Sequence, residues 1–412
     1  MAEGDNPSIC RTCGKPFPPG ATQCPKCDTR FSLILHSRET VLSLTALIVI
    51  VLFFLTGFIT RGYHEKLAVL GEQWFEAGEQ QLKSGNARAA LADFHTALVY
   101  RPDDAQIQFR LAEALAADHR DSEALAYLHG LLTRSPSDAP INLALARIAS
   151  TNGSEADAVR YYHGAIYGVW PRDAEAKRLN ARLELCRFLI ARNDKSIAEA
   201  ELIALVSEIP EEHGAELHAQ AGELFLRIGD ARRALAEFRS ALTVAHPPAD
   251  SLRSAGLAAY QLGEYQQAER YLERANRLRE GDAEVSSDLT ISRLVIFADP
   301  YARGLSEAER RDRTRRAFEQ AFARLQSCAK ASGTNLSARG TPQSDLAKLY
   351  TQANALRPQL TDRNLRRHPG QIDVAMNLVF AIEDVATQEC GAPQNIDEAL
   401  TLIGKSRQDR ER

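Results

Sequence analysis

The stretch WFEAGEQQLKSGNARAALADFHTALVYRP, residues 74–102, sets a pattern that most of the chain follows. Small and aromatic residues recur in it at helical spacing on both sides of a glycine turn, and a proline closes it. The residues that carry the pattern are Trp74, Ala77, Gly78, Gly85, Ala90, Phe94, Ala97 and Pro102. This order predicts two antiparallel helices joined by a tight turn.

The same order returns with a period of 34 residues: Pro102 and Pro136 stand 34 apart, as do Gly222 and Gly256. An insertion of six residues precedes the fourth unit, and about six units fill residues 71–282. Each unit has a small residue in its first helix, namely Gly78, Ala112, Ala146, Cys186, Gly222 or Gly256. Cys186 is therefore expected to be a buried packing residue.

This periodic order resembles the tetratricopeptide-repeat (TPR) family. The resemblance implies an all-α solenoid of helical hairpins, in which large residues such as Phe94 and Phe238 fill the next unit. It also implies an inner wall, formed by the first helix of each unit, that binds partner proteins or peptides. The residues expected on this wall are Phe75, Glu79, Phe109, Glu113, Arg147, Glu223, Arg253 and Tyr260.

A second feature, Val41–Thr60, carries no charge, and fourteen of its twenty residues are Val, Ile, Leu or Phe. As a helix it is roughly 30 Å long, the thickness of a bilayer core. Its apolar residues favour insertion by roughly 4–8 kcal/mol. We expect residues 41–60 to form one transmembrane helix, followed by a connector at 61–70; the alternative is a buried core helix.

The head, residues 1–40, contains Cys10, Cys13, Cys24 and Cys27 as two C-x2-C pairs ten residues apart. This spacing suits a tetrahedral zinc site of four thiolates, and the alternative is two disulfides. The head is too small to build an apolar core, so bound zinc would fold it. Residues 8–31 resemble the bacterial zinc-ribbon family, which implies a structural zinc with no open position for a substrate.

The charges around the span give its orientation. Lys26, Arg30 and Arg38 precede it and Arg61 and Lys66 follow it, which favours a cytoplasmic N-terminus. Zinc-bound thiolates also suit a reducing compartment. We therefore expect a bacterial inner-membrane protein of one span, with the repeat-bearing body outside the cytoplasm.

The tail, residues 283–412, shows further helical segments at about 283–297, 306–328, 344–357, 371–390 and 395–405, with a flexible loop at 330–343. In an up–down–up packing the helices that end at Cys328 and Cys390 run parallel. Both cysteines then emerge at one end, which predicts a disulfide across 62 residues; the alternative is two unrelated thiols.

No motif for nucleophilic, metal-assisted or phosphate chemistry occurs in the sequence, so an enzyme is not expected. The net charge of −4 argues against a nucleic-acid binder, and the arginines of the 306–328 segment are interleaved with acids. The sequence predicts a membrane-tethered scaffold for other proteins, in envelope assembly. The alternatives are a zinc- or redox-responsive transmembrane sensor, or an enzyme whose site lies in the tail.

Overall fold

The computed structural model describes residues 8–17, 21, 23–210, 214–279, 281–336 and 344–411. The described residues are almost entirely helical, so the expected all-α fold of helical hairpins is confirmed. The chain divides into two compact units, residues 1–136 and 137–412. This division falls within the range 71–282 that the repeat pattern covers.

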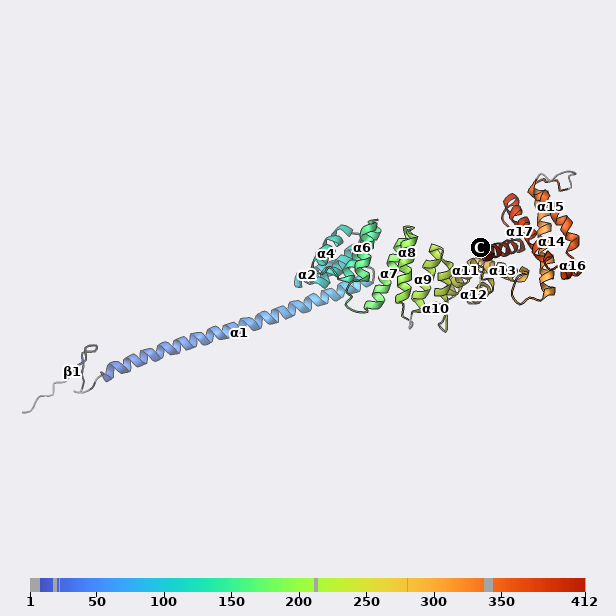
Figure 1. The fold of residues 1–412 in the computed structure, drawn as a ribbon. Helices are drawn as coiled ribbons and strands as arrows, with labels where there is room; N and C mark the ends of the chain where they lie inside the picture. The colour runs from blue at the N-terminus through green and yellow to red at the C-terminus, as the bar shows by residue number, and fades with distance from the viewer. Residues whose placement is uncertain are drawn as a thin grey trace, which may run out of the picture. The chain divides into compact units, whose positions relative to one another are not determined.

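The first unit begins with a two-stranded hairpin and continues as helices. Strands β1 (Ser8–Ile9) and β2 (Pro16–Phe17) are antiparallel. The helices are α1 (Pro25–Lys83), α2 (Ala87–Tyr100), α3 (Ala105–Ala117) and α4 (Asp121–Arg134). The last part of α1 packs on α2, and α3 packs on α4, which makes two hairpins (Figure 1).

Helix α1 is continuous from the head through the apolar stretch and the connector 61–70 into the first hairpin. Its most apolar window has a mean hydropathy of 2.7 and no buried residue, so by length and composition it could cross a membrane. The hydroxyls of Thr45 and Thr56 donate to the carbonyls of Leu42 and Leu52 at 2.8 Å. These bonds satisfy the hydroxyls of these two threonines inside the apolar stretch.

The second unit begins with four hairpins that pack in sequence (Figure 1). They are α5 (Ala139–Thr151) with α6 (Glu155–Ile166), α7 (Ala174–Ala191) with α8 (Lys195–Glu208), α9 (Ala215–Ile228) with α10 (Ala231–Ala241), and α11 (Ala249–Gln261) with α12 (Tyr265–Leu278). The left-handed backbone of Gly229 (φ 93°) ends α9 and allows the tight turn into α10.

The small residues of the repeat pattern lie where two helices of a hairpin approach each other. A Cβ atom at Gly78 would lie 2.6 Å from the ring of Phe94, and one at Gly222 would lie 2.9 Å from the ring of Phe238. Cys186 is fully buried, and burial raises the pKa of its thiol to about 12. It is therefore a packing residue, as expected.

The tail forms a second helical cluster that packs on the last repeat through α13. Its elements are α13 (Ala283–Ala298), α14 (Glu307–Ala331), α15 (Asp345–Leu356), the 3-10 turn η1 (Arg357–Gln359), α16 (Asp362–Arg367), α17 (Gln371–Cys390) and α18 (Ile396–Glu411). The expected segments correspond to helices, whereas η1 and α16 were not predicted. Residues 337–343 of the expected flexible loop lie outside the described residues.

Candidate functional site

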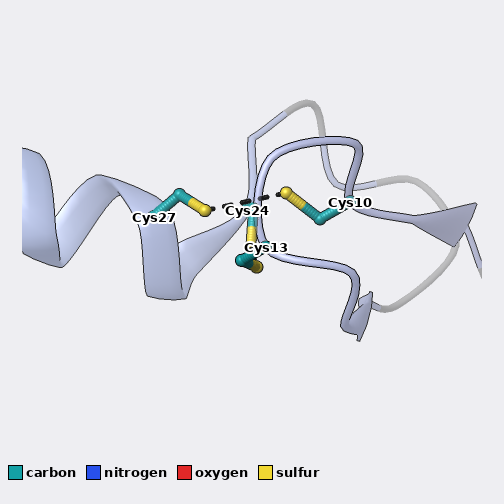
Figure 2. Close-up of side chains that lie close together, drawn as sticks. All are labelled: Cys10, Cys13, Cys24 and Cys27. Atoms are coloured by element: carbon teal, nitrogen blue, oxygen red, sulfur yellow. Dashed lines mark hydrogen bonds between the residues drawn. The ribbon is translucent and has the colours of Figure 1, made fainter.

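Four cysteines of the head point toward one another (Figure 2). Cys10 follows strand β1 and Cys13 lies in the turn after it. Cys24 precedes α1, and Cys27 lies in its first turn. All four sulfur atoms lie within 4.8 Å of one another. The two C-x2-C pairs predicted from their spacing are thus brought together in one cluster.

Each C-x2-C pair lies in a tight backbone turn, or knuckle, whose hydrogen bonds hold its two cysteines in place. The N–H of Cys10 donates to the carbonyl of Lys15 at 3.0 Å, and that of Gly14 donates to the carbonyl of Cys10 at 2.9 Å. Gly14 has φ 68°, a conformation that most side chains disfavour, and it lets the first knuckle close. In the second knuckle the N–H of Cys27 donates to the carbonyl of Cys24 at 3.1 Å.

The cluster has the dimensions of a tetrahedral metal site. A tetrahedron with metal–sulfur bonds of about 2.3 Å has sulfur–sulfur edges of about 3.8 Å. The Cys10–Cys27 and Cys13–Cys24 edges measure 3.7 and 3.8 Å. Four thiol donors at these distances are compatible with zinc.

The electrostatics of the cluster favour a thiolate at Cys10. Hydrogen bonds from the backbone of Thr12 and Cys13 lower the pKa of Cys10 to about 6. Hydrogen bonds with Cys13 and Cys10 raise the pKa of Cys27 to about 12. A cation at the centre of the cluster would favour all four thiolates.

Four charged residues expected on the inner wall form ion pairs with residues outside the expected set, mostly across neighbouring repeats. In the second unit Arg147 of α5 binds Glu184 of α7 through two bonds of 2.9 and 2.6 Å. Arg253 of α11 binds Glu284 of α13 at 3.2 Å. These bonds join the first helices of neighbouring hairpins. They engage Arg147 and Arg253, which were expected from the sequence to contact a partner protein.

In the first unit Arg110 lies between the two expected acids, Glu79 of α1 and Glu113 of α3, and binds both. The pairing raises the pKa of Arg110, chiefly through its bonds to Glu79. Sequence reasoning missed Arg110, Glu184 and Glu284. The signal that could have found them is opposite charge about one repeat apart.

The aromatic and remaining acidic residues of the expected wall have different environments. Phe75 is only 9% exposed and its ring lies 5.9 Å from that of Phe94, so it belongs to the hairpin core and not to an open wall. Phe109 is half-buried. Tyr260 is half-buried edge-on against Tyr265, and burial raises its pKa. Glu223 is exposed and pairs with no described residue.

The tail holds the second predicted cysteine pair. The sulfur atoms of Cys328 and Cys390 are bonded in the structure, with their Cα atoms 5.7 Å apart at the ends of α14 and α17. One turn away, Arg324 binds the fully buried Glu383 and also donates to Thr387 at 3.4 Å. The Cys328–Cys390 disulfide and the buried Arg324–Glu383 hydrogen bond hold the same two helices together.

A family model described as tetratricopeptide repeat matches residues 75–139 and 220–283. The crystal structure of PilW, a widely conserved type IV pilus biogenesis factor, has 18% identity and a TM-score of 0.41. Its match covers 53% of this chain and 98% of PilW. Pseudomonas aeruginosa PilF has 14% identity and a TM-score of 0.41, over 54% of this chain and 96% of PilF.

The TPR domain of P58(IPK) has 15% identity and a TM-score of 0.27, over 83% of this chain and 99% of that domain. No curated protein matches the chain.

Proposed function

We propose that this chain, which carries tetratricopeptide repeats at residues 75–139 and 220–283, is a membrane-tethered scaffold that holds partner proteins in a cell envelope. Proteins built from these repeats bind other proteins. The observation that carries the tether is the uncovered apolar part of α1, which runs without a break into the first hairpin. A membrane-tethered scaffold needs the repeats and the apolar helix, and it needs no catalytic group.

The metal-compatible cluster supports a structural zinc in the head. Cys10, Cys13, Cys24 and Cys27 would supply four thiolates and complete a tetrahedron, which leaves no position for a substrate. When bound, zinc would join β1 and β2 to the first turn of α1. The chain's own contribution is the pair of backbone knuckles that already holds the sulfurs at suitable distances.

The cysteines of the head and those of the tail support a location of the repeat-bearing body outside the cytoplasm. Free thiols at a metal-compatible cluster suit a reducing compartment, whereas a Cys328–Cys390 bond persists in an oxidising one. A span between them separates the two environments. This arrangement favours an inner-membrane protein with a cytoplasmic head.

The binding surface of the scaffold is proposed to be the exposed part of the inner wall in the second unit. Glu223 is the best-placed residue, because it is exposed on α9 and is not engaged by any described neighbour. Arg147 and Arg253 line the same wall, but their ion pairs with Glu184 and Glu284 first have to be exchanged for partner contacts.

Site-specific photo-crosslinking in native membranes tests this proposal. A photoreactive phenylalanine analogue at Glu223 should give a discrete covalent adduct with a partner protein. The same analogue at Arg270, an exposed residue of the second helix α12, is the matched control and should give none. Absence of an adduct at Glu223, or the same adduct at both positions, would contradict binding through the wall.

A regulatory role is the second candidate, and one observation favours it. Cys24 and Cys27 of the head cluster lie at the start of α1, and the same helix continues into the first repeat. Metal loss would release the beginning of a helix that reaches the body. Zinc that exchanges within minutes at physiological chelator strength would support this role, and zinc that never exchanges would exclude it.

A further inference from the structure

The tail carries a surface hollow of about 460 Å³ lined by arginines from two separate segments. Arg315 and Arg316 come from α14, and Arg357 comes from η1, about forty residues later. Glu319, Gln320 and the buried residues Phe318 and Leu360 complete its lining. In the sequence the arginines of α14 are interleaved with acids, and the folded tail adds a second basic segment beside them.

Two of these arginines are held in fixed orientations. Glu319 binds Arg357 through two bonds of 3.0 and 2.7 Å, and the guanidinium lies 4.9 Å from the centre of the Phe322 ring. Arg316 is bound by Asp312 at 3.0 Å and lies 4.5 Å from the centre of the Phe297 ring. Fixed guanidinium groups lose little freedom when they bind a further anion.

Arg315 differs from its neighbours because it is exposed and makes no ion pair with a described residue. It lies one turn after Arg311, which binds Asp362 of α16 at 2.8 Å. Asp362 also binds Arg366 at 2.7 Å, so α16 is fixed beside this face of α14. Residues 357–367 contain four arginines and one acid, which gives this segment a charge of +3.

We propose that this arginine hollow, lined by Arg315, Arg316, Arg357, Glu319, Gln320, Phe318 and Leu360, binds an acidic segment of a partner protein. The guanidinium fork of Arg315, which makes no ion pair within the described part of the chain, matches a carboxylate through paired hydrogen bonds. This surface is separate from the inner wall and extends the proposed scaffold by a second docking point.

Other anionic partners fit the hollow less well. Single-stranded nucleic acid is bound through exposed aromatic rings on which bases stack. The ring that lines the hollow, Phe318, is fully buried, and the nearby Phe297 and Phe322 rings are each covered by an arginine. A bilayer presents a flat surface, whereas Arg315, Arg316 and Arg357 line a concave one. An acidic peptide can place a carboxylate inside it.

The test uses the full chain in nanodiscs of uncharged lipid. The probe is a short fluorescein-labelled peptide that alternates glutamate pairs with leucine, followed by fluorescence anisotropy. The Arg315→Gln/Arg357→Gln variant should weaken its binding about tenfold, as the loss of close charge pairs at an interface does. A peptide with glutamine in place of glutamate should not bind.

The matched control is Arg270→Gln/Arg274→Gln, which removes two exposed arginines of α12 and should leave the affinity unchanged. Arg315→Gln alone keeps the test valid if loss of the Arg357–Glu319 contact disturbs folding. Equal loss in both double variants, or equal binding of the glutamine peptide, overturns the proposal. Preferential binding of single-stranded DNA or phosphatidylglycerol vesicles, lost in Arg315→Gln, overturns it in favour of those partners.

Discussion

Gly78 and Gly130 are both helical glycines of the first unit, but they have opposite surroundings. A Cβ atom at Gly78 would collide with Phe94, whereas one at Gly130 would meet nothing within 4 Å. Gly78→Ala should therefore destabilise the protein by about 1–3 kcal/mol through overpacking. Gly130→Ala should stabilise it by about 0.5–1 kcal/mol, because alanine favours the helix. Thermal unfolding of the full chain in detergent checks both, and equal shifts would contradict the hairpin packing.

Glu383 offers a pH-dependent test at the same scale. Burial raises its pKa from 4.5 to about 8 despite the neighbouring Arg324. The folded protein then holds a proton that the unfolded chain releases, so wild type should lose stability as the pH rises from 4.5 to 8. Glu383→Gln should remove that loss. Denaturant unfolding of both proteins across this range measures it, and parallel curves would contradict the raised pKa.

The residue scale also shows where prediction from sequence stops. The four head cysteines could be assigned because a C-x2-C pair is local and needs no knowledge of the fold. The wall charges could be placed on their helices, but their engagement by Arg110, Glu184 and Glu284 depends on contacts between repeats. The charge of a residue in the sequence does not show whether an arginine forms an ion pair within the chain or is available to bind a partner protein.

At the scale of elements, the Cys328–Cys390 bond links α14 to α17. It closes a loop of 62 residues, for which the chain-entropy model gives roughly 4 kcal/mol. Reduction of the full chain should therefore lower its unfolding temperature, and Cys390→Ser should lower it equally and abolish the effect of reductant. Non-reducing peptide mapping of protein from native membranes measures the bond itself. Free thiols at both positions in that material would contradict it.

Long helices such as α14 and α17 could be predicted because their apolar spacing extends over many turns. The short α16 could not, since six residues carry too little periodicity and its stability comes from the buried Leu365 and the Arg311–Asp362 pair. The arginine hollow was missed for the same reason, because the short turn η1 and Leu360 after it supply its second side.

For the whole molecule, the head is expected to carry one zinc ion per chain. Elemental analysis of purified full-length protein should give this stoichiometry. Cys13→Ser should abolish it because the tetrahedron loses a ligand, whereas Cys186→Ser should retain it because Cys186 lies in a repeat core. Loss of metal in both variants, or none in wild type, would contradict a structural zinc site.

The orientation of the chain across the membrane is the most consequential expectation at this scale. The positive charges differ by only one between the two sides of the span, so the free thiols of the head and the tail disulfide carry much of the argument. Trypsin added to spheroplasts should degrade the arginine-rich body and leave a protected fragment that contains the head and the span. An epitope at the N-terminus should remain on that fragment until the membrane is permeabilised. A protected body with a cleaved head would reverse the topology and place the repeats, their inner wall and the arginine hollow among cytoplasmic partners.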